Sequence, residues 1–237
     1  MIYDSPICRD GNKFSSTFGR ILEFPAEIRR LAASALYELS MRFDLGIDPA
    51  VGLTSGKYFG AHLRTSDDAT RLGWIDYDTQ KDRYLKICEE AGLSTIYVAS
   101  GNAPDTKRFA SAASPRNVVT KFDLLPEADA AFLRNMTWDQ QVSIHCAHIH
   151  LLKTIHNLTS LQALVDYEIL LKSSKFSGMT DSSFSWNIAT RRRILSDTVL
   201  CSHWPVSIPQ SIALIDNLSI VIGDREAHPD FSIGLWP

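Results

Sequence analysis

Apolar residues along this chain follow two different spacings. From Pro25 to Leu39 they recur every three or four positions, and residues 78–92 repeat that spacing and end at Gly92. Both segments are therefore expected to be amphipathic helices, the first opened by a proline and the second closed by a glycine. Other apolar runs are short and rich in β-branched residues, which is typical of buried strands. We expect strands at residues 57–64, 94–100 and 117–125, with further helices at 106–113 and 127–136.

This alternation of helices and strands predicts the fold class. It is typical of an α/β protein with a Rossmann-like parallel sheet and helices on both of its faces. We expect one such domain over residues 25–237, preceded by an irregular segment at 1–24. Ligands of these sheets bind outside the carboxyl ends of the strands, so polar turns that follow strands are the first candidates for a site.

Two polar turns stand in that position. HLRTSDDA (62–69) follows the first strand, and Arg64 in it would offer the donors of its guanidinium to a phosphate. The second turn follows KFSGM and places Ser182 and Ser183 at the start of a helix, where unpaired N–H groups attract anions. Together the turns favour a pyrophosphate ligand. The structural alternatives are an ordinary serine helix cap and a surface ion pair of the arginine.

Composition narrows the function classes. The 237 residues are 45% hydrophobic with a net charge of −3, so no overall attraction to nucleic acid is expected. No apolar run reaches the roughly 18 residues of a membrane span, and the first residues do not resemble a signal peptide. The four cysteines form no CxxC pair. GLTSGKY (52–58) lacks the spacing and the hydroxyl residue of a phosphate-binding P-loop, and no GxGxxG occurs.

The two turns, in this order and separation, resemble the GDP-fucose protein O-fucosyltransferase family, particularly its fungal members. The residues that carry the resemblance are YFGAHLRTSDDA (58–69), IYVASG (96–101) and KFSGMTDSSFSWNIATRR (175–192). The resemblance implies the C-terminal, nucleotide-sugar-binding half of a two-domain GT-B glycosyltransferase. It also implies GDP-fucose as donor substrate, a serine or threonine hydroxyl of a protein acceptor, no metal and no other cofactor, and the secretory pathway as location.

The resemblance further implies roles for individual residues. Arg64 is similar to the essential arginine that contacts the β-phosphate and stabilises the leaving diphosphate. His62 corresponds to a residue that lines the nucleotide pocket, and Asp68 to an acidic residue that supports Arg64. The turn that holds the phosphates corresponds to Ser182, Ser183 and Phe184.

The sequence also departs from the family. Nothing in residues 1–24 matches the glycine-rich GGxGNQ-type turn of the family's N-terminal half, and Ser174 stands nearest to an acidic position of several members. An alternative interpretation is therefore an inactive nucleotide-sugar-binding remnant or pseudoenzyme. A third is a transferase that uses a different nucleotide sugar.

A histidine-rich segment, VSIHCAHIHLLKTIHNLTSLQ (142–162), allows three interpretations. This segment contains five typical metal ligands whose spacing matches no standard zinc module: His145, Cys146, His148, His150 and His156. Without this segment the flanks join as TWDQQALVDYEILLKSS, one amphipathic helix with capping-box spacing at Thr137 and Gln140. Its ends are compatible with the codons of a small fungal intron. Our hypothesis is a translated retained intron, and an ordinary loop insertion is the remaining alternative.

Two further segments have mainly structural interpretations. Arg191, Arg192 and Arg193 close a predicted helix, where cations interact favourably with the helix dipole. Trp186 is expected in the core. The apolar run at 211–223 predicts a strand or a helix that returns to the sheet.

Overall fold

The computed structural model describes residues 23–48, 50, 56–135, 160–195 and 212–223. These residues form a sheet with the strand order β3-β2-β1-β4-β6-β5. Five of the strands are parallel, and β5 pairs antiparallel with β6 at one edge. The strands are β1 (Phe59–His62), β2 (Thr95–Ala99), β3 (Asn117–Val119), β4 (Lys175–Met179), β5 (Ile212–Ile215) and β6 (Ser219–Ile222).

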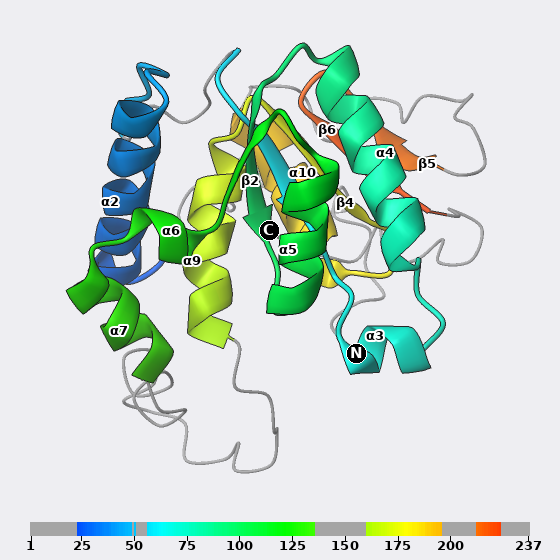
Figure 1. Cartoon of the computed structure of the whole chain (residues 1–237), viewed down its shortest axis with the longest axis horizontal. Coiled ribbons are helices and arrows are strands. Elements are labelled where there is room, and N and C mark those ends of the chain that lie inside the picture. The colour runs from blue at the N-terminus through cyan, green and yellow to red at the C-terminus, as the bar shows by residue number, and fades with distance from the viewer. Residues whose placement is uncertain (1–22, 49, 51–55, 136–159, 196–211, 224–237) are drawn as a thin grey trace, which may run out of the picture.

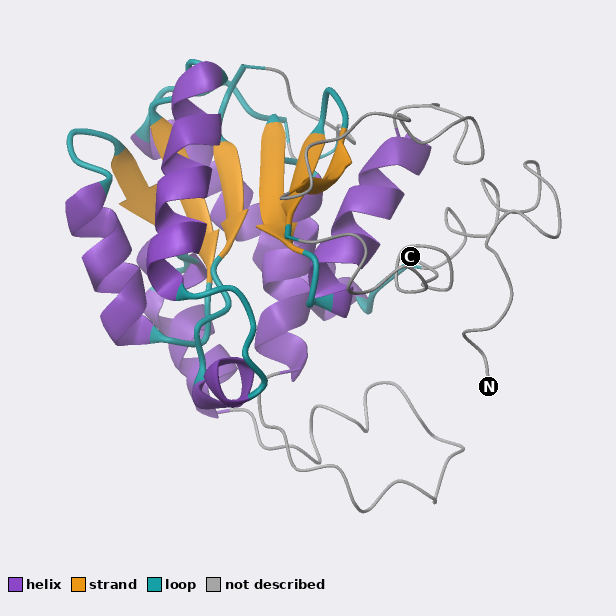
Figure 2. Ribbon diagram, turned by 90° about the vertical axis from the view of Figure 1, so that its right-hand side faces the viewer, coloured by secondary structure: helices purple, strands orange, loops and turns teal. Residues whose placement is uncertain are grey.

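Helices cover both faces of this sheet, and Figure 2 shows the strands between the two helical layers. One apolar cluster joins the sheet to α2 (Ala26–Arg42), α6 (Lys121–Leu124), α7 (Glu127–Asn135), α9 (Ser160–Leu171) and α10 (Ser183–Leu195). The other cluster joins the opposite face to α4 (Tyr77–Glu90) and α5 (Ala103–Ala112). A short helix, α3 (Asp67–Arg71), lies between β1 and α4 (Figure 1). The predicted α/β, Rossmann-like fold class is thereby confirmed.

The central strands are apolar on both faces because both faces are covered. In β1, Phe59 and Ala61 pack in the cluster of α4 and α5, while Tyr58, just before the strand, packs in the cluster of α2, α9 and α10. Along β2, Ile96 and Tyr97 divide in the same way. Successive side chains of a strand point to opposite faces, so a strand with two covered faces has no polar alternation.

Two predicted boundaries of helices and strands were wrong because side-chain caps start helices at these positions. The helix expected from residue 106 begins at Ala103, since the Asn102 side chain accepts a hydrogen bond from the N–H of Asp105 and so caps the helix. The strand expected at 117–125 ends at Val119. Thr120 and Asp123 form a capping box there and start the short helix α6. Gly92, in contrast, has the positive φ of 65° that a glycine at a helix C-terminus often adopts.

The remaining predicted elements have mixed outcomes. The run at 211–223 forms the β5–β6 hairpin, so it belongs to the sheet. Residues 1–22 lie outside the described part of the chain, as does most of the histidine-rich segment. Its last three residues, 160–162, form the first turn of α9. Of the helices that the structure describes, none combines the length and the apolar character needed to cross a membrane.

Arg192 shows that a cation near a helix end need not serve its own helix. It lies in the last turn of α10, but its side chain is fully buried and donates to the carbonyl oxygens of Leu170 and Leu171, at the end of α9. It also donates to the hydroxyl of Ser219 on β6 and thereby joins α10, α9 and the sheet. The structural interpretation of this arginine is correct, but the helix whose carbonyls it satisfies is α9. Trp186 is buried as predicted.

Candidate functional site

A pocket of about 390 Å³ lies at the carboxyl ends of the strands. Its walls come from the turns that follow β1, β2, β3 and β4, together with one side of α9. The strand order reverses between β1 and β4, because β2 and β3 follow on one side of β1 while β4 and β6 lie on the other. Open α/β sheets bind their ligands at such a switch point. The polar lining residues are His62, Arg64, Ser100, Lys121, Gln162, Asp166, Asp181, Ser182 and Ser183.

The turn after β1 carries Arg64 into this pocket, and a buried amide fixes its backbone. Gln80 of α4 accepts a hydrogen bond from the N–H of Arg64 at 3.0 Å and donates one to its carbonyl oxygen, also at 3.0 Å. The same amide donates to the carbonyl oxygen of Ile75 at 2.6 Å. The Arg64 guanidinium contacts the hydroxyl of Ser66 and lies 5.8 Å from the ring centroid of Trp74. Main chain and side chain of Arg64 are thus both guided toward the pocket.

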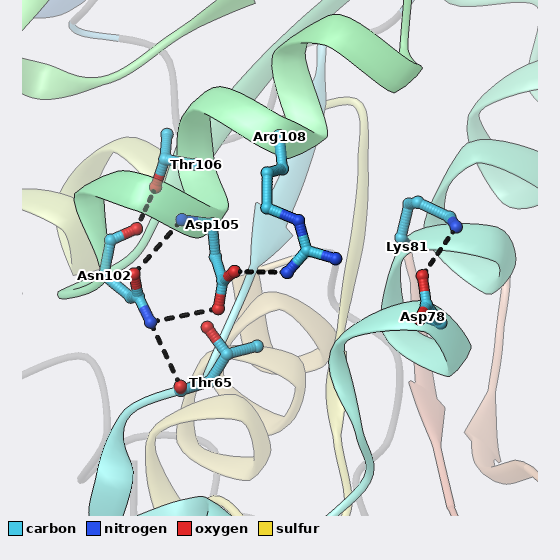
Figure 3. Close-up of polar contacts among 7 residues, drawn as sticks. All are labelled: Thr65, Asp78, Lys81, Asn102, Asp105, Thr106 and Arg108. Carbon is cyan, nitrogen blue, oxygen red and sulfur yellow. Dashed lines mark hydrogen bonds and ion pairs between the residues drawn. The ribbon is translucent and has the colours of Figure 1, made fainter.

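A second amide holds the next residue of this turn. Figure 3 shows Asn102, at the start of α5, donating from Nδ2 to the carbonyl oxygen of Thr65 at 3.2 Å and to the carboxylate of Asp105 at 3.0 Å. Asp105 in turn pairs with Arg108 at 2.9 Å. The Arg64 turn is therefore tied both to α4 and to the N-terminus of α5.

The serine turn after β4 forms another wall of the pocket. Ser182 is buried and its hydroxyl accepts a hydrogen bond from the N–H of Ser185 at 3.4 Å, so it caps α10. Ser183 is the exposed first residue of the helix. The first N–H groups of a helix have no partner within it, and those of Ser183 and Phe184 belong to a stretch that lines the pocket. The side chain of Trp186 donates to the carbonyl oxygen of Thr180 at 2.8 Å and fixes the turn from below.

His62 joins the two turns. Its Nδ1 lies 2.8 Å from the hydroxyl oxygen of Ser185, and its ring centroid lies 4.7 Å from that of Phe184. Burial, reinforced by the nearby charge of Arg64, lowers the pKa of His62 from 6.5 to about 3. The imidazole is therefore neutral at physiological pH, and the Arg64 guanidinium beside it stays the cation of this part of the pocket.

The floor of the pocket contains a buried ionic group that the sequence did not reveal. Lys121, just after β3, pairs with Asp166 of α9 at 2.6 Å, and the Tyr97 hydroxyl donates to the same carboxylate at 2.6 Å. Burial raises the pKa of Asp166, whereas Lys121 opposes that rise. The available signals were Asp166, one of two carboxylates within the otherwise apolar run ALVDYEILL, and a lysine directly after a strand. Neither feature of the sequence indicates that Asp166 and Lys121 form a pair.

Five of the predicted site residues lie together. His62, Arg64, Ser182, Ser183 and Phe184 all line the one pocket. They come from two turns that are far apart in the sequence, and the pairing of β1 with β4 brings them together.

Two other residues were named from the sequence, and the structure places the side chain of only one of them. Asp68 lies in the short helix α3, and its side chain is outside the described part of the structure. Ser174 lies at the opposite end of the sheet, where its hydroxyl accepts a hydrogen bond from the N–H of Lys57 at 2.7 Å. Ser174 therefore does not line the pocket, and it does not take the place there of the acidic residue found in several family members.

A metal centre has no candidate within the described ranges. No group of three or more His, Cys, Asp and Glu side chains in them could hold a metal ion. The five candidate ligands of the histidine-rich segment lie outside those ranges.

Fold and pocket together define an α/β protein of the Rossmann type with a polar pocket at its topological switch point. A scan against protein-family models gives no match. A search of curated proteins likewise gives no significant match.

Proposed function

We propose that this chain binds a nucleotide sugar through its diphosphate, with GDP-fucose as the donor. We further propose that it is the donor-binding half of a GT-B O-fucosyltransferase. The observation that carries the proposal is that Arg64 and the N-terminus of α10 line one pocket. The resemblance of both turns to the O-fucosyltransferase family supports the choice of GDP-fucose.

The chemistry of the two walls suits a diphosphate. The planar fork of an arginine donates two hydrogen bonds to phosphate oxygens, and the charge of both partners strengthens them. The first N–H groups of α10 and the positive end of its dipole attract the same kind of group. Lys121 also lines the pocket and is paired with Asp166. We assign the diphosphate to Arg64 and the N-terminus of α10, which line the pocket together.

In the proposed reaction the bond between the sugar C1 and the β-phosphate oxygen breaks. A new bond forms between C1 and the oxygen of a serine or threonine hydroxyl, whose proton passes to water. The electrons of the broken bond remain on GDP, so negative charge grows on the diphosphate. Arg64 and the N–H groups of α10 would stabilise this charge, and a preorganised donor of this type lowers a barrier by roughly 3 kcal/mol.

Calorimetric titration with GDP and GDP-fucose tests the proposal. We expect binding by the unsubstituted chain and at least about a tenfold loss of affinity in Arg64→Ala, because a charge-assisted pair is removed. Arg42→Ala is the matched control, since Arg42 is an exposed arginine on α2 that pairs with Glu38. Equal affinity of Arg64→Ala and Arg42→Ala would contradict the assignment of the phosphate site.

Two further measurements separate the alternatives. UDP-sugars and GDP-mannose, titrated as competitors, decide whether the pocket selects GDP-fucose or a different nucleotide sugar. Transfer of fucose from GDP-fucose to a peptide that contains serine and threonine decides whether the chain catalyses the reaction, and release of free fucose reports hydrolysis. Binding without transfer or hydrolysis would reassign the chain to a non-catalytic nucleotide-sugar-binding protein.

A further inference from the structure

Ser185 forms hydrogen bonds to both of the strands that lead into the pocket, β1 and β4. It is fully buried in the first turn of α10, and its hydroxyl oxygen lies 2.8 Å from Nδ1 of His62 on β1. The same oxygen accepts a hydrogen bond from the N–H of Met179 on β4 at 3.2 Å. This close approach depends on Gly178, because a Cβ at that position would lie 2.6 Å from the Cβ of Ser185. The chain thus uses a glycine where the helix must come nearest to the strand.

The hydrogen bonds of Ser185 determine where its proton goes. A serine hydroxyl has one proton to donate and two lone pairs to accept with. Its oxygen accepts from Met179, and among the described residues the only acceptor for its own proton is Nδ1 of His62. A neutral imidazole carries one proton, so a ring that accepts at Nδ1 must carry its proton on Nε2.

We infer that Ser185 is a positioning residue that holds His62 as the Nε2–H tautomer, so that His62 offers a hydrogen-bond donor to the ligand in the pocket. Within the described part of the chain Nε2 has no protein hydrogen-bond partner, and His62 lines the pocket. The low pKa of the buried ring agrees with this, since a second proton on Nδ1 would oppose the bond from Ser185.

This assignment limits the chemistry of His62. The ring has no lone pair directed to the ligand, so it does not act as a general base from Nε2. Its partner must be an acceptor, such as a phosphate oxygen or a carbonyl oxygen of a nucleobase. The identity of that ligand rests on the proposed function, whereas the tautomer does not.

Nitrogen-15 NMR of the histidine-labelled, ligand-free chain tests the tautomer directly. The two ring nitrogens of His62 should show a bare Nδ1 and a protonated Nε2, and this pattern should hold from pH 8 to pH 5. In Ser185→Ala the fixed pattern should be lost, because no other hydroxyl in the described ranges is placed to donate to Nδ1. A protonated Nδ1 in the unsubstituted chain would overturn the inference, whatever the chain binds.

Affinity for GDP then tests the consequence for the ligand. Ser185→Ala should weaken GDP binding about tenfold, as expected for losing the geometry of a bond to a charged group. Ser177→Ala is the matched control, since Ser177 is an equally buried serine of β4 whose hydroxyl donates to the carbonyl oxygen of Ile220 at 2.8 Å. It should leave GDP affinity unchanged.

A double variant shows whether Ser185 acts through His62. In a His62→Ala background the further change Ser185→Ala should have no effect on GDP affinity. A full additional loss there would show that Ser185 acts only through the backbone, and would overturn the positioning role. If the unsubstituted chain binds no GDP at all, the proposed function fails, while the NMR result still decides the tautomer.

Discussion

Arg64 and Arg192 are two arginines of one chain with opposite surroundings. Arg192 is fully buried, and its donors reach the carbonyl oxygens of Leu170, Leu171, Ser173, Ser174 and Leu218 and the hydroxyls of Ser173 and Ser219. Burial lowers its pKa to about 10, which still leaves it charged at neutral pH. Arg64 is only partly buried, lines the pocket, and contacts a hydroxyl and an aromatic ring.

The difference shows how the surroundings decide what an arginine can do. Around Arg192 the acceptors are backbone carbonyls of three structural elements, and an incoming anion could not replace them without breaking the fold. Around Arg64 the backbone, and not the guanidinium, is held by Gln80. We conclude that a fixed main chain and a side chain directed into a pocket mark the arginine that is suited to bind a ligand.

The largest expected effect in this comparison is that of Arg192→Lys. A lysine has three donors on one atom and cannot reach all of the carbonyls that surround the edge of the planar guanidinium. Several buried carbonyl groups would lose their partners, at about 1–3 kcal/mol each. We expect the free energy of unfolding to fall by at least about 3 kcal/mol, measured by urea denaturation. A stability within about 0.5 kcal/mol of the unsubstituted chain would contradict the structural role of Arg192.

Gln80→Leu should have the next largest effect. It leaves the N–H and carbonyl oxygen of Arg64 without their partner, which we expect to cost about 2 kcal/mol of stability. GDP affinity should also fall about fivefold, because the Arg64 turn loosens. Cys88→Ala, at a buried site of the same helix, should lower stability and leave the affinity unchanged.

The link between Gln80 and Arg64 can be tested by combining the variants. In an Arg64→Ala background, Gln80→Leu should no longer change the affinity for GDP. An unchanged loss in that background would show that Gln80 influences binding by another route.

Arg64→Lys should have a smaller effect and should not affect folding. The charge remains but the two-pronged geometry is lost, so GDP affinity should fall about tenfold, or about 1.4 kcal/mol. Thermal unfolding should stay within about 2 °C of the unsubstituted chain, since the backbone contacts of Arg64 do not involve its side chain. The change from arginine to lysine should therefore lower the free energy of unfolding at position 192 and not at position 64. Equal losses of stability at both positions would contradict the comparison.

The last prediction concerns the neutral histidine beside Arg64. The pKa of His62 is lowered from 6.5 to about 3 on folding, so the unfolded chain binds a proton more readily. Stability is therefore lost as the pH falls below about 6.5, by at most about 1.4 kcal/mol per pH unit from this group. His62→Gln does not titrate and should show a shallower decline between pH 6.5 and 5 in urea denaturation. Parallel curves for the two chains would show that His62 is not buried as a neutral group.

The amino-acid sequence determined the fold class of this protein and the positions of its two polar turns. The alternation of helical and strand patterns was enough because each pattern reflects a local period of burial. Helices such as α2 and α4, and the buried strand β2, follow this rule and lie where the pattern predicts them. Local capping, at Asn102 and at Thr120, shifted only the ends of elements.

Only the tertiary structure decided which residues meet. The pairing of β1 with β4 brings Arg64 and Ser182 to one pocket, and the packing of α9 on the sheet brings Asp166 to Lys121. The partners of Arg192, the clamp of Gln80 on Arg64 and the bond from Ser185 to His62 are likewise contacts between elements distant in the sequence. A periodic pattern records which face of an element is buried. It contains no information on the neighbour that buries it, and for a polar group that neighbour decides between a structural contact and a binding site.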